Sequence, residues 1–160
     1  MIAVAYLRAL FGHVSVQDKS ARESLQTFAG GKGDVLIAYE NEAITAQHKG
    51  VKLQYIIPAQ TILIENPVAV TTTTAHPVQA RAFVSFLWTP TAQRLFAGKG
   101  YRPVLASAAK EFSYRTPPGL FRITGLGLGG WTSVSTKFFD PQNGIMAQIE
   151  RERGVGVGSG

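Results

Sequence analysis

Hydrophobic positions recur every three to four residues in several segments of the chain, and this spacing is typical of helices that pack on one face. The segments are residues 2–11, 21–30, 40–48, 77–88, 90–97 and 131–139. Their ends carry residues that stop or start helices: Gly12, Gly30, Gly50 and Gly98 close four of them, while Pro77 and Pro90 open two. The pattern therefore predicts a helix in each segment.

Other segments have the composition of strands. Residues 34–39 form a continuous apolar run, D-V-L-I-A-Y, which is typical of a strand buried in a parallel sheet. Residues 13–16 alternate, and residues 53–57, 62–70 and 120–123 are rich in β-formers. Pro67 interrupts one of these runs and predicts a bend or an edge position there. Strands between helices predict the α/β fold class.

Ser20, Ala21, Arg22 and Glu23 form a capping box at the start of the second predicted helix. The Ser20 hydroxyl can accept the Glu23 N–H, and the Glu23 carboxylate can accept the Ser20 N–H. Free N–H groups and the positive end of the helix dipole meet at this point, which makes it a candidate oxyanion site. An ordinary capped helix is the alternative, because every helix has an N-terminus.

The net charge of +6 suits an anionic partner. Lys and Arg are scattered and form no basic run, so nucleic acid is not the expected partner. The 160 residues include no cysteine, which excludes disulfides, thiolate metal sites and a thiol nucleophile. No apolar stretch approaches the roughly 20 residues of a membrane span. The first residues lack a basic start and a small-residue cleavage site, so no signal peptide is predicted within this chain.

The motifs that could indicate an enzyme or a cofactor lack the sequence context or the spacing that they require. Residues 125–130, G-L-G-L-G-G, match a dinucleotide-binding fingerprint, but too little chain follows to build its βαβ unit. The histidines lack paired ligand spacing, so no metal site is expected. Glu40 and Glu42 lie two apart, which points them to different sides of a helix. We expect no enzyme and no cofactor, although a Ser-His-Asp set assembled only in three dimensions stays open.

Residues 33–43, G-D-V-L-I-A-Y-E-N-E-A, resemble the signature of periplasmic sulfate- and thiosulfate-binding proteins, G-D-V-L-(I/L)-A-W-E-N-E-A. Upstream, D-K-S-A-R-E-S at 18–24 is similar to the family's D-S-G-A-R-G-(S/A). Downstream, T-P-T-A-Q at 89–93, Y-R-P at 101–103 and G-G-W at 129–131 match further family motifs in the same order. The resemblance covers nearly the whole chain but only the C-terminal portion of the family.

The resemblance implies an incomplete periplasmic-binding-protein-like fold of type II, in which an anion lies between two lobes. Residues 1–38 and 119–150 would belong to the second lobe, residues 39–118 to the first, and residues 154–160 to a flexible tail. The family holds its anion through N–H groups at helix N-termini. Carried over, Ala21 would be a main-chain donor, Tyr39 would replace a tryptophan donor, Ser20 would cap the site, and Arg22 would support the loop. Glu23 stands where the family has glycine.

The resemblance further implies the substrate-binding component of an ABC sulfate importer, periplasmic or otherwise extracytoplasmic, with sulfate and the membrane permease subunits as partners. Thiosulfate or molybdate are alternative ligands, since geometry and size alone separate these anions. An inactive truncated fragment is another reading, because residues 34–39 need sheet neighbours. An effector-sensing domain of a transcription regulator would need a helix-turn-helix, which the sequence does not show.

Overall fold

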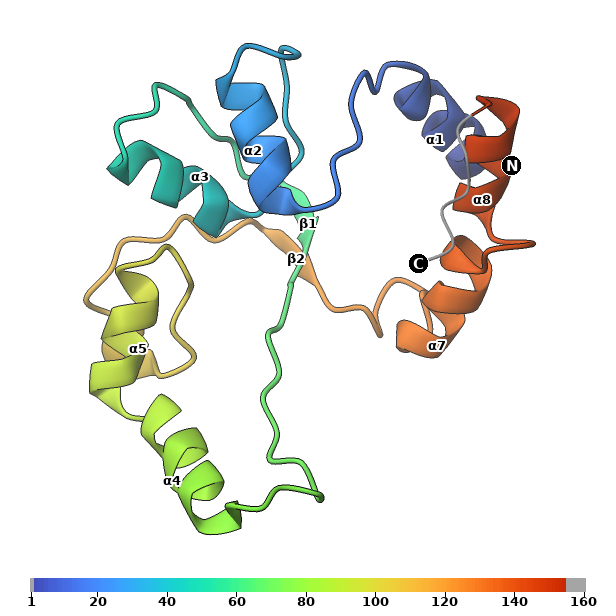
Figure 1. Cartoon of the computed structure of the whole chain (residues 1–160). Coiled ribbons are helices and arrows are strands. Elements are labelled where there is room, and N and C mark those ends of the chain that lie inside the picture. The colour runs from blue at the N-terminus through green and yellow to red at the C-terminus, as the bar shows by residue number, and fades with distance from the viewer. Residues whose placement is uncertain (1, 155–160) are drawn as a thin grey trace. The chain divides into compact units, whose positions relative to one another are not determined.

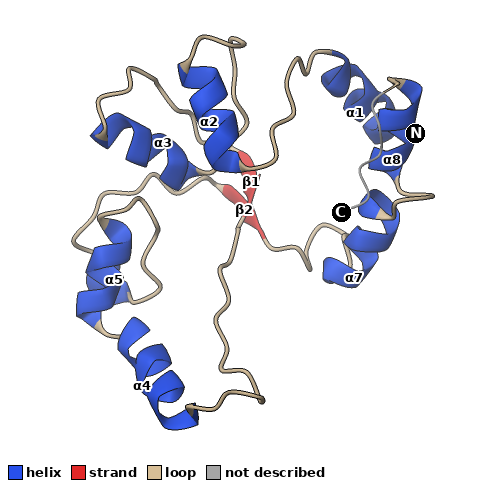
Figure 2. Ribbon diagram, in the orientation of Figure 1, coloured by secondary structure: helices blue, strands red, loops and turns tan. Residues whose placement is uncertain are grey.

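The computed structural model describes residues 2–154. Helices dominate, and only two short strands occur in this part of the chain (Figure 2). The elements are, in order, α1 (Ile2–Gly12), α2 (Ala21–Ala29), α3 (Glu40–His48), β1 (Gln60–Ile62), α4 (Pro77–Leu87), α5 (Pro90–Ala97), α6 (Ala106–Ala109), β2 (Gly119–Phe121), α7 (Gly130–Val134), the π-helix η1 (Ser135–Phe139) and α8 (Ile145–Glu152), as labelled in part in Figure 1.

The chain forms two compact units. Unit 1 consists of Met1–Gln17, Gln60–Ile64 and Gly119–Gly160, and unit 2 of Asp18–Ala59 and Glu65–Pro118. Residues 18–38 thus group with residues 39–59, whereas the sequence analysis assigned them to different lobes. The lobe boundaries of the complete fold stay a prediction. The expected tail lies, apart from Gly154, outside the described residues.

Unit 1 is held by an N-terminal and a C-terminal helix that lie side by side, α1 and α8 (Figure 1). Arg8 donates two hydrogen bonds of 2.8 Å to the Glu152 carboxylate, and Ile149 on α8 is only 1% exposed. The strands β1 and β2 pair in parallel, with Gln60 opposite Gly119 and Ile62 opposite Phe121. This is the sheet of the described chain, and it is three residues long on each strand.

Unit 2 packs α2 against α3 and α5 against both α4 and α6. Apart from Leu25, its buried apolar side chains are alanines: Ala43, Ala46, Ala92, Ala97 and Ala108. A core of alanines allows close approach of helices but removes little apolar area from water. The helices of this unit therefore depend on polar contacts at their ends as well as on packing.

The predicted helices are confirmed, and their caps explain why. Ser20 and Thr89 both cap with their hydroxyls, and Pro77 and Pro90 stand in the first turns where no N–H is needed. The helix expected at 131–139 begins as α7, continues as η1 and ends at Asp140 before Pro141. The glycine-rich residues 125–130 form a turn into α7, with Gly127, Gly129 and Gly130 at positive φ.

Most predicted strands are wrong. Residues 13–16, 34–39 and 53–57 have no strand pairing, and 62–70 contributes only Ile62 to β1. The prediction at 120–123 is nearly right, since β2 covers Gly119–Phe121. A strand exists only when a neighbour accepts and donates its backbone hydrogen bonds, and a sequence pattern does not supply that neighbour. The described chain offers residues 34–39 no such neighbour.

The helix α4 has the predicted length, but its apolar side is not buried. Val78, Phe83, Phe86 and Trp88 are 70%, 60%, 44% and 57% exposed. The amphipathic pattern was therefore right about the helix, although of its predicted apolar face only Ala80, Val84 and Leu87 are half-buried. None of the helices in residues 2–154 is long and apolar enough to cross a membrane.

Candidate functional site

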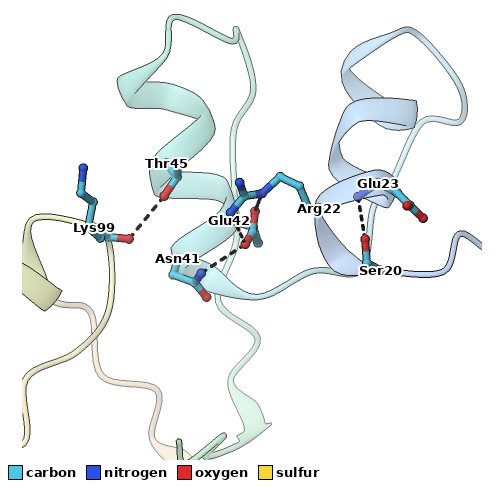
Figure 3. Close-up of polar contacts among 7 residues, drawn as sticks. All are labelled: Ser20, Arg22, Glu23, Asn41, Glu42, Thr45 and Lys99. Atoms are coloured by element: carbon cyan, nitrogen blue, oxygen red, sulfur yellow. Dashed lines mark hydrogen bonds and ion pairs between the residues drawn. The ribbon is translucent and has the colours of Figure 1, made fainter.

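The N-terminus of α2 is capped as the sequence indicates. Ser20 has extended backbone angles, and its Oγ accepts a hydrogen bond of 3.2 Å from the N–H of Glu23 (Figure 3). The reverse bond, from the Ser20 N–H to the Glu23 carboxylate, is not among the hydrogen bonds of the described chain, so this half of the capping box is wrong. Asp18 adds a second contact to α2, because its carboxylate accepts a hydrogen bond of 3.1 Å from the Thr27 hydroxyl.

This capping leaves two main-chain donors at the start of α2. Within residues 2–154, the N–H groups of Ala21 and Arg22 have no acceptor, whereas the Glu23 and Ser24 N–H groups bond to Ser20. Unpaired N–H groups in a first turn carry the positive end of the helix dipole. The position can therefore donate to an anion, and the oxyanion site expected there from the sequence stays a prediction.

The second helix N-terminus of unit 2 belongs to α3 and begins at Tyr39. Tyr39 has extended backbone angles, and its carbonyl accepts the N–H groups of Glu42 and Ala43 at 3.1 and 3.4 Å. Its side chain is 51% exposed and makes no capping bond. No described residue bonds to its hydroxyl, which is thus available as a donor.

A bidentate ion pair joins the first turns of α2 and α3. Arg22 donates to both carboxylate oxygens of Glu42, at 2.9 and 3.1 Å, and Asn41 adds a longer bond of 3.4 Å to the same carboxylate (Figure 3). Glu42 is only 7% exposed. Its hydrogen bonds raise the pKa of Arg22 above the usual value, so the guanidinium stays charged. The guanidinium of Arg22 is thus bound to Glu42, and the role of Arg22 beside an anion stays a prediction.

Glu40, two residues before Glu42, forms an ion pair with a different arginine, Arg102. Arg102 donates to its two carboxylate oxygens at 2.6 and 3.0 Å, and it also donates to the Arg115 carbonyl at 2.7 Å. The guanidinium carbon lies 5.2 Å from the centre of the Tyr114 ring, within range of a cation–π contact. The hydrogen bonds that Arg102 donates to Glu40 are the main cause that raises the pKa of Arg102.

These two pairings were not predicted from the sequence. The spacing of Glu40 and Glu42 speaks only against an acid and base pair, because it points them to different sides of a helix. The same geometry is what lets each carboxylate take a different arginine. The sequence places Arg22 and Arg102 in motifs before and after E-N-E, but it does not indicate which arginine pairs with which carboxylate.

Further contacts fix α3 against the loop after α5. The Thr45 hydroxyl donates to the Lys99 carbonyl at 3.3 Å (Figure 3), and Gly100 approaches the backbone of α3 at Asn41. Gln93 on α5 is 7% exposed, and its amide donates to the Leu87 carbonyl and accepts the Val104 N–H, both at 2.8 Å. The conspicuous motif residues outside the first turns of α2 and α3 thus serve the scaffold.

All four residues predicted for the site lie in unit 2. Ser20, Ala21 and Arg22 start α2, and Tyr39 starts α3. The Arg22–Glu42 pair connects the two helices at these ends. In the described residues no group of three or more His, Asp or Glu side chains could hold a metal ion. The arrangement offers neutral N–H and O–H donors, while its arginine is already bound to a carboxylate.

The chain matches the sequence model of the bacterial extracellular solute-binding protein family over residues 3–102. It is 41% identical over 142 residues to a sulfate-binding protein of Synechococcus elongatus, covering 86% of this chain and 41% of that protein. The identity to the Escherichia coli sulfate-binding protein is 33%, with 91% and 46% covered. A thiosulfate-binding protein of Pseudomonas aeruginosa is 30% identical, with 92% and 46% covered.

A solved structure is also similar, that of the sulfate-binding protein SubI from Mycobacterium tuberculosis. The TM-score is 0.73 at 44% identity, and the likeness covers 81% of this chain and 45% of that one. The fold class expected from the sequence is confirmed by this likeness. The chain spans less than half the length of the relatives that it matches.

Proposed function

The chain belongs to the bacterial extracellular solute-binding protein family, and from that premise we propose that it supplies helix N-terminal donors to sulfate in the binding component of an ABC-type importer. The Ala21 N–H and the Tyr39 hydroxyl are the direct donors in this proposal. Ser20 holds the first turn of α2 and keeps its own O–H free to donate. The guanidinium of Arg22 acts through Glu42 and does not contact the anion, whereas the main-chain N–H of Arg22 is free to donate beside that of Ala21.

The observation that carries the proposal is the pair of N–H groups at Ala21 and Arg22, which have no acceptor within the described chain. Sulfate is strongly hydrated, so a site must replace its water with several donors. Main-chain N–H groups at a helix start do this without a mobile cationic side chain. The net charge of +6 adds a long-range attraction for anions.

Thiosulfate is the second candidate, because one relative carries that name. Its tetrahedral shape suits the same donors, and its larger terminal sulfur is a weaker acceptor. A comparison of both anions therefore belongs in the test. The proposed setting is outside the cytoplasmic membrane, where the loaded protein would meet the membrane permease subunits. The role proposed is binding, with no chemical step.

The site can be tested by amide NMR titration of the chain with sulfate at fixed ionic strength. We expect the Ala21 and Arg22 resonances to shift with sulfate. The matched control is the start of α5, where Thr89 caps the Ala92 N–H at 3.3 Å in the same way as Ser20 caps α2. The amide resonance of Thr91 should not shift when sulfate is added. Equal shifts at both helices would mean unspecific anion attraction and would contradict the proposal.

Calorimetry adds a test of affinity. The chain alone should bind sulfate in the millimolar range or more weakly, because each missing charge-assisted hydrogen bond costs about 1.5–3 kcal/mol, or roughly one to two decades of affinity. A version extended to the full length of its relatives should bind far more tightly. In that version Tyr39→Trp and Glu23→Gly should each tighten binding further. Micromolar binding by the 160-residue chain would show that the site is misplaced.

A further inference from the structure

The start of α3 is held by other segments of unit 2 and not by a cap of its own. Tyr39 precedes the helix, and its side chain makes no capping hydrogen bond. α3 has nine residues, and an uncapped end of so short a helix frays easily. Glu40 and Glu42 connect this first turn to the rest of unit 2 through their ion pairs.

Of these two ion pairs, the one at Glu40 is closer to Tyr39 along the chain. Glu40 follows Tyr39 directly, and Arg102 donates to both of its carboxylate oxygens, at 2.6 and 3.0 Å. The Arg102 and Glu40 side chains are 30% and 21% exposed, whereas those of Arg94 and Glu111 are 49% and 43% exposed. Water and salt screen a partly buried pair less than an exposed one, so the pair at Glu40 holds its geometry better.

The Arg102 guanidinium is fixed from two further directions. It donates to the Arg115 carbonyl at 2.7 Å, and its central carbon lies 5.2 Å from the centre of the Tyr114 ring. The Tyr114 hydroxyl in turn donates to the carbonyl of Tyr101, one residue before Arg102, at 3.0 Å. The guanidinium thus has contacts on one face and along its edges, which leaves it little freedom to rotate.

The Tyr39 side chain has no such support. It is 51% exposed, and its hydroxyl bonds to no described residue. The position of this hydroxyl therefore depends on the backbone at Tyr39 and on where the first turn of α3 lies. A hydroxyl donates to an oxygen only at about 2.5–3.0 Å, so a displacement of the turn by roughly 1 Å would remove the bond.

We propose that Arg102 is a positioning residue for the Tyr39 hydroxyl, because through Glu40 it fixes the point from which Tyr39 donates to the anion. This inference rests on the proposed function, since it needs Tyr39 as a donor. Arg102 does not contact the anion, because its guanidinium is bound to Glu40 and to the Arg115 carbonyl. A merely structural role would affect the stability of unit 2 without acting on the Tyr39 donor in particular.

A double-mutant cycle with Tyr39→Phe separates these two roles. The sulfate dissociation constant is measured on the 160-residue chain from the shift of the Ala21 amide resonance at fixed ionic strength. We expect Arg102→Met to weaken sulfate binding about three- to tenfold in the parent chain, as the partial loss of one hydrogen bond to an anion. In the Tyr39→Phe chain the same substitution should change binding less than about twofold, because no hydroxyl is left to position.

The cycle distinguishes failure of this inference from failure of the proposed function. Equal weakening by Arg102→Met in both chains would overturn the positioning role and leave Tyr39 as a donor. If Tyr39→Phe alone leaves sulfate binding unchanged, Tyr39 is not a donor, and both the proposed donor and its positioning residue are wrong. A chain whose Ala21 amide does not respond to sulfate would contradict the site itself.

Arg94→Met is the matched control. Arg94 makes a bidentate pair with Glu111 in the same unit, and its substitution removes the same single positive charge as Arg102→Met. Sulfate binding should change less than about twofold in Arg94→Met, since Arg94 lies on α5 and does not touch the first turn of α3. Similar weakening by the two methionine variants would mean that net charge or general loosening acts on the site, and would refute the inference.

Two milder variants act on the same ion pair and replace Arg102→Met if that variant does not fold, as judged by circular dichroism. Arg102→Lys keeps the positive charge but cannot donate in a bidentate manner, and Glu40→Gln removes the carboxylate while Arg102 stays. Each should weaken sulfate binding in the parent chain and act less than about twofold in the Tyr39→Phe chain. Parent-like sulfate binding in both folded variants would show that the pair does not position Tyr39.

Discussion

Gly100 lies directly against the first turn of α3, where a Cβ on Gly100 would come within 2.9 Å of the Cα of Asn41. Gly100 also has a φ of +86°, which side chains rarely adopt. The contact sets the separation between α3 and the loop that leads to Arg102.

Gly100→Ala should destabilise unit 2 through strain and through this contact. Gly50→Ala is its control, because Gly50 has a φ of +85° but nothing within 4 Å of the added Cβ. Strain alone costs about 1–2 kcal/mol, and the overpacking at Asn41 adds about 1–3 kcal/mol. Urea unfolding of Gly100→Ala and Gly50→Ala measures the loss of stability in each variant. Equal losses at the two glycines would mean that the helix shifts freely.

The Arg22–Glu42 pair should respond unequally to removal of its partners. Arg22→Met leaves a nearly buried carboxylate without its guanidinium, whereas Glu42→Gln leaves a cation that is half in water. We expect Arg22→Met to cost about 1–3 kcal/mol and Glu42→Gln less. A larger loss for Glu42→Gln in denaturant titrations would refute this order.

Substitution of Gln93 should lower the free energy of unfolding, because its side-chain amide forms hydrogen bonds with two backbone groups. Gln93→Leu leaves the Leu87 carbonyl and the Val104 N–H without their partner and should cost about 1–3 kcal/mol. Gln47 is the control, since it is exposed and makes one bond of 3.0 Å, to the Leu53 carbonyl. Gln47→Leu should change the free energy of unfolding by less than about 0.5 kcal/mol. Similar losses at the two positions would count against the bridging role of Gln93.

Acid should weaken the contact between α5 and the residues after α6. The hydrogen bonds from Arg94 lower the pKa of Glu111, so its folded value lies below its unfolded value. The contribution is therefore complete above the unfolded pKa and disappears as the pH falls through the lower, folded one. The parent chain should be more stable than Glu111→Gln near neutral pH and lose that advantage in acid. A pH-independent difference would contradict the pairing.

The helices could be predicted because their signals are local. Ser20, Thr89 and the prolines of α4 and α5 act within one turn, and the structure places those helices as expected. α8 was not predicted, although Ala147 and Ile149 give it a buried face, because the break at Asp140 and Pro141 predicts the end of helical structure. The strand predictions failed because pairing depends on distant partners.

The candidate site shows the same limit. The free N–H groups at Ala21 follow from a local capping pattern and were found in the sequence. The carboxylate pairs were not, because Arg102 and Glu40 are 62 residues apart and only the fold brings them together. The spacing of Glu40 and Glu42 predicts that their side chains point in different directions. It does not predict which arginine each carboxylate binds.

The two glutamates of α3 also set an order of events during synthesis. Arg22 precedes Glu42 by 20 residues, so their contact can form as soon as α3 has left the ribosome. Arg102 follows Glu40 by 62 residues and emerges about 3–12 s later at about 5–20 residues per second. During that interval the nascent α3 has its ion pair with α2, through Arg22 and Glu42, but not yet its ion pair with Arg102. Ribosome-bound chains stopped before Arg102 is exposed should therefore already contain the joined α2 and α3, while their Glu40 stays open to solvent.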